Sequence, residues 1–385
     1  MQPLTGVRVL DLSRLIPGPF ASLVLADMGA AVDKVEDTGA GDYIRHFPPE
    51  IAGASGPFHA LNRGKRSLLL DLKNPRGRDA LLRILPRYDV LLEQFRPGVM
   101  DRLGLGHATL RETCPSLIVC ALTGYGQTGP LKDRAGHDLN YLARAGILGF
   151  QGPAGQAPAV PGFQMADVSG GMWCVIAILG ALRERERTGA GTVLDIAMVD
   201  GVLGFASAAF GSIFGGQLPA RGDEPLSGGI AVYQTYLSKD DRPMSLGALE
   251  PKFWQSFCEA VGLPLSMGAF LPGPHQAELK AQVAAIFRTR TRAEWEELAK
   301  TRDCCLEPVL SPEELRDDPH LVARELFFEV DSGGTKIGQY RTPVTPKDRT
   351  FAPAPRPGEH TDIILRDAGM TDSDIAELRA AKAIA

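Results

Sequence analysis

The best candidates for acid–base chemistry in this sequence are a histidine and an aspartate that lie in glycine-rich turns. The histidine is His137, between Gly136 and Asp138, and the aspartate is Asp167, which precedes a pair of glycines. Imidazole and carboxyl groups are among the side chains that most often transfer protons in enzymes. Each residue also has a plainer interpretation, because a single histidine is often structural and an aspartate ahead of a helix is often its cap. The pair therefore indicates an acid–base site without naming a substrate.

The helix that should position Asp167 is the most apolar stretch of the chain. Its apolar run is Met172–Leu182, and basic residues followed by Gly189 close its C-terminal end. A helix that is apolar on every side is expected to be buried, so its positive N-terminal end should point into a protected place. Asp167 or Ser169 can cap that end, and the two glycines would let a ligand approach the backbone. The apolar run is too short to span a bilayer, so we expect a core helix.

Basic residues form a second set of candidates. They are concentrated between Asn62 and Ser67 and recur at Lys73, Arg96 and Arg102. The cluster is either a solvated basic surface or an anion site, because Arg and Lys near strand ends commonly bind phosphate groups. The residues alone leave both interpretations open.

Composition and charge narrow the class of protein. The 385 residues are 44% hydrophobic and 23% charged, as in a soluble globular protein, and the formal net charge is -5. This charge argues against nucleic acid or an anionic membrane as the main partner. The six cysteines lack the spacing of a zinc site, and the adjacent Cys304 and Cys305 are most simply free thiols. With no signal segment predicted, we expect a cytoplasmic protein.

The order of the predicted elements indicates an α/β fold with a Rossmann-like large domain and a smaller α+β domain. Residues 1–218 alternate short apolar strands with helices, which is typical of a parallel sheet. No G-x-G-x-x-G sequence links a strand to a helix, so a nicotinamide or flavin site is not predicted. Residues 219–330 begin with an antiparallel pair, 230–237 and 244–249, and the proline-rich segment 331–385 should return to the large domain. Further helices are predicted over residues 201–214, 276–288, 292–301 and 312–326.

Three stretches of the chain resemble the family III coenzyme A (CoA) transferases. They are Gly29 to Glu36 with Gly41-Asp42, Asn62 to Lys73, and Phe95-Arg96-Pro97-Gly98 with Arg102-Leu103-Gly104-Leu105. The resemblance covers essentially the whole chain and is strongest to the racemases of the family. Gly136-His137-Asp138 and Gly247-Ala248-Leu249-Glu250-Pro251 resemble racemase motifs, and the transferases usually lack that histidine. The resemblance implies a Rossmann-like large domain, a small domain and an interlocked homodimer.

The resemblance also implies a reaction, the racemisation or epimerisation of 2-methylacyl-CoA thioesters by 1,1-proton transfer through an enolate. His137 and Asp167 would act on opposite faces of the α-carbon, and Glu250 from the other subunit would orient the histidine. Backbone N–H groups at the start of the central helix would hold the enolate oxygen. The resemblance implies no metal and no tightly bound cofactor, because CoA is part of the substrate.

The implied CoA contacts come from four segments, and their Lys and Arg side chains would bind the phosphates. These contacts are Leu70, Asp71, Leu72, Lys73, Gln94, Phe95, Arg96, Arg102, Gly136, Asp138, Leu139, Asn140 and Tyr141. The acyl chain would lie against the apolar segments 147–150 and 205–214. Two alternatives stay open, a CoA transferase that uses Asp167 as its nucleophile and a CoA-binding protein without catalytic activity.

Overall fold

The computed structural model describes residues 2–385, which are divided between two compact units. The larger unit contains the chain up to Ala145, together with Gly162–Gly204 and Pro319–Ala385. The smaller unit contains Gly146–Pro161 and Phe205–Asp318. The chain therefore leaves the larger unit and returns to it twice.

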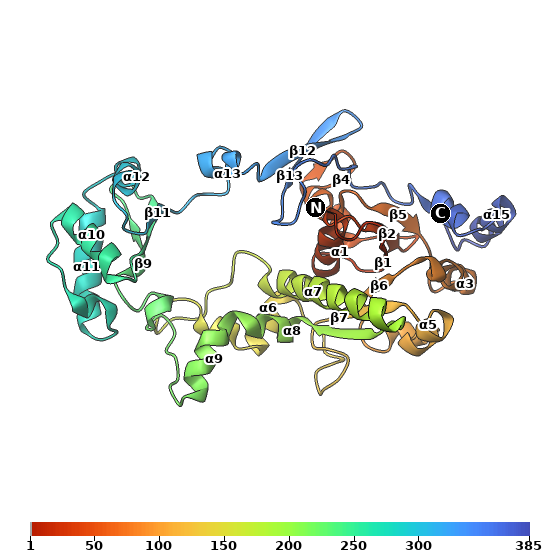
Figure 1. Ribbon diagram of the computed structural model, residues 1–385, viewed down its shortest axis with the longest axis horizontal. Helices are drawn as coiled ribbons and strands as arrows, with labels where there is room; N and C mark the ends of the chain where they lie inside the picture. The colour runs from red at the N-terminus through yellow and green to blue at the C-terminus, as the bar shows by residue number, and fades with distance from the viewer. Residues whose placement is uncertain (1) are drawn as a thin grey trace. The chain divides into compact units, whose positions relative to one another are not determined.

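A six-stranded sheet forms the centre of the larger unit (Figure 1). Its strands are Arg8–Asp11 (β1), Ala31–Glu36 (β2), Arg66–Leu69 (β5), Val90–Glu93 (β6), Ile118–Thr123 (β7) and Val193–Ala197 (β8). They lie in the order β5-β2-β1-β6-β7-β8, and every neighbouring pair is parallel. The order of the strands reverses between β1 and β6, where Val9 lies beside Val90. Such a reversal leaves a crevice outside the carboxyl ends of the strands, which is where doubly wound sheets bind ligands.

The composition of the strands explains why the sheet is parallel. All residues of β6 and β7 are buried, and nearly all of them are apolar. Strands of this kind need helices on both faces of the sheet, as connections between parallel strands supply. The helices that follow strands include Pro17–Asp27 (α1) and Pro75–Ile84 (α3). The predicted α/β class with a parallel sheet is confirmed.

The central helix, Met165–Thr188 (α7), ends at Gly189, which has a φ of +72°. It packs against α1, β7 and the short helix Met198–Gly201 (α8). A Cβ atom on Gly171 would lie 2.6 Å from the carbonyl oxygen of Pro17, and one on Gly170 would lie 2.7 Å from the side chain of Met198. The glycine pair therefore permits close packing of α7 on its neighbours. The prediction that a ligand approaches the backbone there was wrong.

One face of α7 is exposed in the single chain. The exposed fractions of Met172, Trp173 and Ile176 are 49%, 44% and 53%. The prediction that this helix is buried on all sides was therefore wrong for the isolated chain. By length and composition alone α7 could cross a membrane, but half of its apolar stretch is buried inside the protein, as in a core helix.

The C-terminal segment packs on the larger unit. Its helices Thr361–Asp367 (α14) and Asp372–Ala380 (α15) add Ile364, Leu365 and Leu378 to the core that contains Leu68 and Leu81. Figure 1 shows both helices beside α3. The segment also contains a hairpin, Phe327–Ser332 (β12) and Thr335–Tyr340 (β13), which was not predicted.

The smaller unit has its own sheet and aromatic core. Strands Tyr233–Leu237 (β9), Pro243–Gly247 (β10) and Leu306–Pro308 (β11) are antiparallel, which confirms the predicted pair. Helices Pro251–Val261 (α10), His275–Phe287 (α11) and Arg292–Thr301 (α12) follow along the chain. The rings of Trp254, Phe257, Phe287 and Trp295 pack together in the core.

Two predicted helices are shorter than expected. Residues 201–214 are divided between α8, a 3-10 turn Val202–Ala206 (η4) and the helix Ser207–Phe214 (α9), in a stretch rich in glycine. Of residues 312–326, the α-helix contains Pro319–Ala323 (α13), because the residue before a proline is kept out of the helical region. The remaining short elements are Tyr43–His46 (η1), Glu50–Ile51 (β3), Ala54–Ser55 (β4), Gly56–Asn62 (α2), Leu85–Arg87 (η2), Val99–Arg102 (α4), His107–Thr113 (α5), Asp138–Arg144 (α6), Ile147–Phe150 (η3), Pro225–Ser227 (η5) and Met267–Phe270 (η6).

Candidate active site

A cavity of about 890 Å³ opens at the carboxyl edge of the parallel sheet. All of its lining residues belong to the larger unit, and most of them follow strands β1, β2, β5, β6 and β7. His137 and Asp167 both line it. The cavity therefore lies at the reversal of strand order, where this kind of sheet binds ligands. The lining residues are 12–15, 17, 35–38, 40–43, 70–73, 94–97, 99, 103, 122–125, 132, 134, 136, 137, 141, 167 and 198.

Asp167 lies in the first turn of α7 and is half-buried. Burial raises the pKa of its carboxyl to about 7, and the negative charge of Asp138 contributes to the increase. A helix N-terminus would favour the ionised form, but here burial and the neighbouring carboxylate outweigh that effect. At neutral pH this carboxyl is therefore a mixture of acid and base, which suits proton transfer in both directions.

Asp138, not Asp167 or Ser169, caps the N-terminus of α7. Its Oδ1 atom accepts the backbone N–H groups of Ala166 at 2.6 Å and of Asp167 at 3.1 Å. The next N–H group, that of Val168, donates to the carbonyl oxygen of Gln164. These three donors already have acceptors within the chain, so an enolate oxygen would need other backbone N–H groups near the helix, and that role stays a prediction. Asp167 lines the cavity and Asp138 does not, so Asp138 supports Asp167 from outside the cavity.

His137 lies at the N-terminus of α6 with its side chain exposed. Its backbone N–H group donates to Oδ1 of Asn140 at 3.0 Å, and the N–H group of Asn140 donates to the carbonyl oxygen of His137. This local exchange holds the backbone of the turn. Asn140 thus supports the histidine from outside the cavity, and Leu139, which was also predicted to contact CoA, is exposed and does not line it.

Tyr141 lines the cavity and is held by two glycines. Its hydroxyl group donates to the carbonyl oxygen of Gly136 at 2.5 Å, and its ring lies edge-on to that of Tyr125. A Cβ atom on Gly136 would lie 2.7 Å from the Tyr141 ring, and one on Gly124 would be closer still. Gly136 therefore lines the cavity as predicted, and it also makes room for this aromatic wall.

The predicted strand-end residues line the cavity at two places. Residues 70–73 follow β5, and Oδ1 of Asp71 accepts the N–H group of Lys73 at 2.9 Å, which holds this turn. Gln94 and Phe95 follow β6, and Oε1 of Gln94 accepts the N–H group of Gly18 at 3.2 Å. That bond and the prolines beside Gly18 leave few free donors at the start of α1.

Exposed cations surround the cavity, and some of them were missed from the sequence. Lys73 and Arg96 line it as predicted, whereas Arg102 does not. Within residues 2–385, none of the lining cations has a carboxylate partner within ion-pair distance, so their charge is available to an anionic ligand. The missed cations could have been identified by their positions, because Arg14 lies shortly after β1 and the other two lie shortly before Gly136. The full set is Arg14, Lys73, Arg96, Lys132 and Arg134.

The basic cluster between Asn62 and Ser67 is neither a solvated surface nor an anion site. The Nη2 atom of Arg63 lies 2.6 Å from Oδ2 of Asp27, and both side chains are buried. Buried Lys65 donates to Ser22 and Asn62, and Arg66 pairs with Asp33 at 2.6 Å. Carboxylates from distant parts of the chain satisfy these charges, so both interpretations of this cluster were wrong.

Glu250 and the predicted acyl-binding segments belong to the smaller unit. Glu250 is exposed and precedes α10 at its N-cap position. The segments 147–150 and 205–214 also lie in that unit, and none of these residues lines the cavity. Their roles as orienting residue and acyl site stay predictions.

The comparisons with known proteins all identify the same family. Residues 4–361 match the sequence pattern of CoA-transferase family III. The chain is 37% identical to the α-methylacyl-CoA racemase of Homo sapiens over 99% of its own length and 97% of that protein. It is 33% identical to the succinate–glutarate CoA-transferase of Agrobacterium fabrum, with 95% of each chain covered. Its structure resembles a CAIB/BAIF family protein from Brucella suis, with a TM-score of 0.83, 29% identity and coverage of 95% and 99% of the two chains.

Proposed function

Because this chain belongs to CoA-transferase family III, we propose that it is a racemase of 2-methylacyl-CoA thioesters. The observation that carries the proposal is that the imidazole of His137 and the carboxyl of Asp167 line one cavity with a set of unpaired cations. Lys73 and Arg96 would bind the CoA phosphates, which leaves the thioester to reach the acid–base pair. The racemase relative, which is 37% identical over nearly the full length of both chains, supports this choice.

In the proposed reaction, one of the two groups removes the proton from the α-carbon, and the electron pair moves into the thioester carbonyl as an enolate. The other group then donates a proton to the opposite face of that carbon, which inverts its configuration. The group that removed the proton is now an acid and the other is a base, so the enzyme is ready for the reverse direction. A carboxyl with a pKa of about 7 can serve in either role at neutral pH.

The alternative is a CoA transferase in which the ionised carboxylate of Asp167 attacks the thioester carbonyl. The relatives include such enzymes, among them the succinate–glutarate CoA-transferase. A nucleophile must be ionised. A carboxyl with a pKa of about 7 is about half ionised at neutral pH, which is enough for a nucleophile as well as for a base, so only the reaction itself separates the two roles.

The deciding experiment uses a single epimer of a 2-methylacyl-CoA in heavy water without an added carboxylic acid. We expect inversion accompanied by uptake of deuterium at the α-carbon, followed by chiral chromatography and mass spectrometry. If the only reaction is transfer of CoA to a carboxylic acid that is added later, the protein is a CoA transferase and this proposal is wrong. Binding of the thioester without either reaction would indicate a CoA-binding protein.

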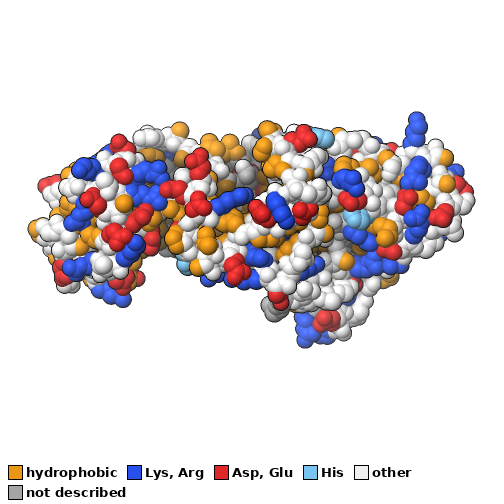
Figure 2. Space-filling view, turned by 90° about the horizontal axis from the view of Figure 1, so that it is seen from above, with side chains coloured by type: hydrophobic (Ala, Val, Ile, Leu, Met, Phe, Trp, Pro, Cys, Tyr) orange, Lys and Arg blue, Asp and Glu red, His pale blue; other side chains and the backbone are white. Residues whose placement is uncertain are grey.

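We further propose that the protein is an interlocked homodimer. The exposed apolar side chains of Met172, Trp173 and Ile176 support this, because an apolar helix face of a soluble protein is normally covered. In such a dimer Glu250 of one subunit would orient His137 of the other. Figure 2 shows hydrophobic side chains between charged ones on the face that it draws.

The free thiols of the cysteines fit a reducing compartment, and we propose the cytoplasm.

A further inference from the structure

The last residue of β6, Glu93, has a buried carboxylate that the proposed reaction does not use. Its side chain is 2% exposed. Its Oε2 atom accepts the backbone N–H group of Phe95 at 2.8 Å, and its Oε1 atom lies 3.1 Å from Nε2 of His107. A buried carboxylate is costly unless hydrogen bonds or a cation satisfy it, and here these two partners do so.

The two partners of Glu93 stand at the two ends of one loop. Phe95 follows β6, His107 begins α5, and between them the chain passes through α4. The loop supplies several lining residues of the cavity, among them Phe95, Arg96 and Leu103. A single carboxylate therefore joins both ends of the segment that presents the guanidinium group of Arg96 to the cavity.

The surroundings of His107 strengthen this connection. Carboxylates face it from three elements, namely Glu93 at the end of β6, Asp101 in α4 and Asp195 in β8. The hydrogen bond and charge of Glu93 make the largest contribution, and together these groups raise the pKa of the imidazole. A protonated imidazole both donates to Glu93 and neutralises it, whereas a neutral imidazole can only donate.

We propose that Glu93 and His107 are a positioning pair that determines the affinity for the CoA part of the substrate by holding the loop between them. This inference rests on the proposed function, since it takes Arg96 to contact the phosphates of CoA. Neither residue touches the reacting atoms. Losing the pair should therefore weaken CoA binding and raise KM while leaving kcat nearly unchanged.

The test measures binding of desulfo-CoA, a CoA analogue without the thiol, to the full-length protein by titration calorimetry, beside KM and kcat. We expect His107→Leu to raise Kd and KM on the order of tenfold, as loss of one partner of a buried carboxylate can cost. His107→Gln, which retains a donor, should recover part of the affinity. Glu93→Gln, which can no longer pair with a charged imidazole, should also weaken binding.

Asp89→Asn is the matched control. Asp89 directly precedes β6, at the end opposite to Glu93, and its Oδ1 atom is 2.8 Å from Nη2 of Arg185. This variant loses an ion pair beside β6 and away from the cavity, so it should lower the melting temperature without changing Kd. If His107 only stabilised the fold, His107→Leu would behave like this control, with a lower melting temperature and an unchanged Kd. That result would overturn the inference.

The pH dependence of binding separates the charge of the imidazole from its hydrogen bond. In the wild type, Kd should rise as the pH increases through the raised pKa of His107, because the imidazolium charge is lost. His107→Gln should lack that part of the change, and comparing the two proteins removes the titration of the ligand. Identical pH profiles would contradict the inference. A wild type that does not bind desulfo-CoA at all would instead contradict the proposed function.

Discussion

Oδ1 of Asp138 accepts the backbone N–H group of Asp167 at 3.1 Å, so one aspartate of the site caps the helix that carries the other. The two carboxyl groups come from α6 and α7, and their proximity has an electrostatic consequence. The charge of Asp138 adds to burial in raising the pKa of Asp167. Asp138 therefore holds Asp167 in place and also helps to keep its carboxyl partly protonated.

Replacing each acid–base group separately should reveal which face of the α-carbon it serves. His137→Gln should slow deuterium exchange mainly from one epimer, and Asp167→Asn mainly from the other, each on the order of a hundredfold or more. Either variant should lose inversion, because the relay needs both groups. Exchange would be followed by NMR for each epimer. Inversion at the wild-type rate by His137→Gln, with all CoA chemistry lost in Asp167→Asn, would instead identify a transferase.

Asp138→Asn should shift the pH profile of the reaction to lower pH. The amide retains an oxygen that can cap α7, but it lacks the negative charge that raises the pKa of Asp167 above its ordinary value. In the direction in which Asp167 removes the proton, the rate should rise with pH through about 7 in the wild type and at lower pH in the variant. In the opposite direction the rate should fall at correspondingly lower pH. Coincident profiles would show that burial alone determines this pKa.

Arg96 and Arg102 form a matched pair that tests the position of the CoA phosphates. Both are exposed arginines close in sequence, but Arg96 lines the cavity and Arg102 does not. Arg96→Ala should raise KM on the order of tenfold, as loss of a charged hydrogen bond to phosphate can cost, with a smaller difference at high salt. Arg102→Ala should leave KM unchanged. Equal changes in KM from the two variants would show that the cavity is not the phosphate site.

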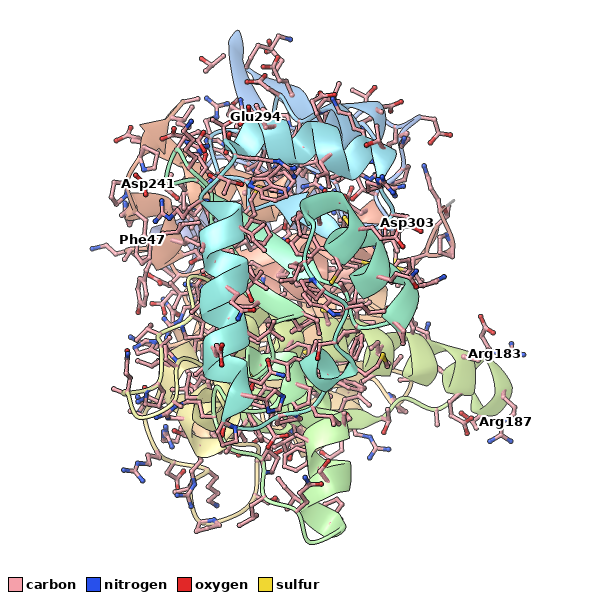
Figure 3. The ribbon with its side chains drawn as sticks, turned by 90° about the vertical axis from the view of Figure 1, so that its left-hand side faces the viewer. Phe47, Arg183, Arg187, Asp241, Glu294 and Asp303 are labelled. Carbon is pink, nitrogen blue, oxygen red and sulfur yellow. The ribbon has the colours of Figure 1, made fainter. Side chains whose placement is uncertain are left out.

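The exposed face of α7 should be part of the subunit interface. Ile176→Glu places a charge on that face, whereas Ile363→Glu places one on α14 at an isoleucine that is similarly exposed, at 50% against 53%. We expect the first variant to lose the dimer in light-scattering measurements and the second to retain it. At the other end of α7, Arg183 and Arg187 are exposed and extend away from the protein (Figure 3). Charge reversal at Arg183 should likewise leave the dimer intact. A fully active wild-type monomer would contradict the proposal.

Coexpression of two defective chains tests whether each active site uses both subunits. If Glu250 and His137 come from different chains, a hybrid of His137→Gln with Glu250→Gln contains one site with both defects and one intact site. Its activity should then exceed the mean of the two parent variants. If both residues come from the same chain, every site carries a defect and no recovery occurs. Glu250→Gln alone should be milder than His137→Gln, because it leaves the imidazole in place.

The sequence by itself determined most elements of the larger unit and several of the residues that line its cavity. Periodicity and turn residues indicated that short apolar strands alternate with helices, and these strands form the parallel sheet. They also indicated that Lys73 and Arg96 lie near strand ends, and in the structure both line the cavity at the carboxyl edge of the sheet. Such features depend on neighbours along the chain, so a local pattern is enough to predict them.

Only the tertiary structure decided what the polar side chains do. Arg63 forms an ion pair with Asp27, and Asp138 accepts hydrogen bonds from the first turn of α7. These partners are far apart in the sequence, so no local pattern predicts their contact. Gly170 and Gly171 serve helix packing instead of ligand access because Met198 and Pro17 approach them from other elements. The sequence around a charged residue or a glycine looks the same whether that residue contacts solvent, a ligand or a distant segment of its own chain. Its role is therefore determined by the partner that folding brings to it.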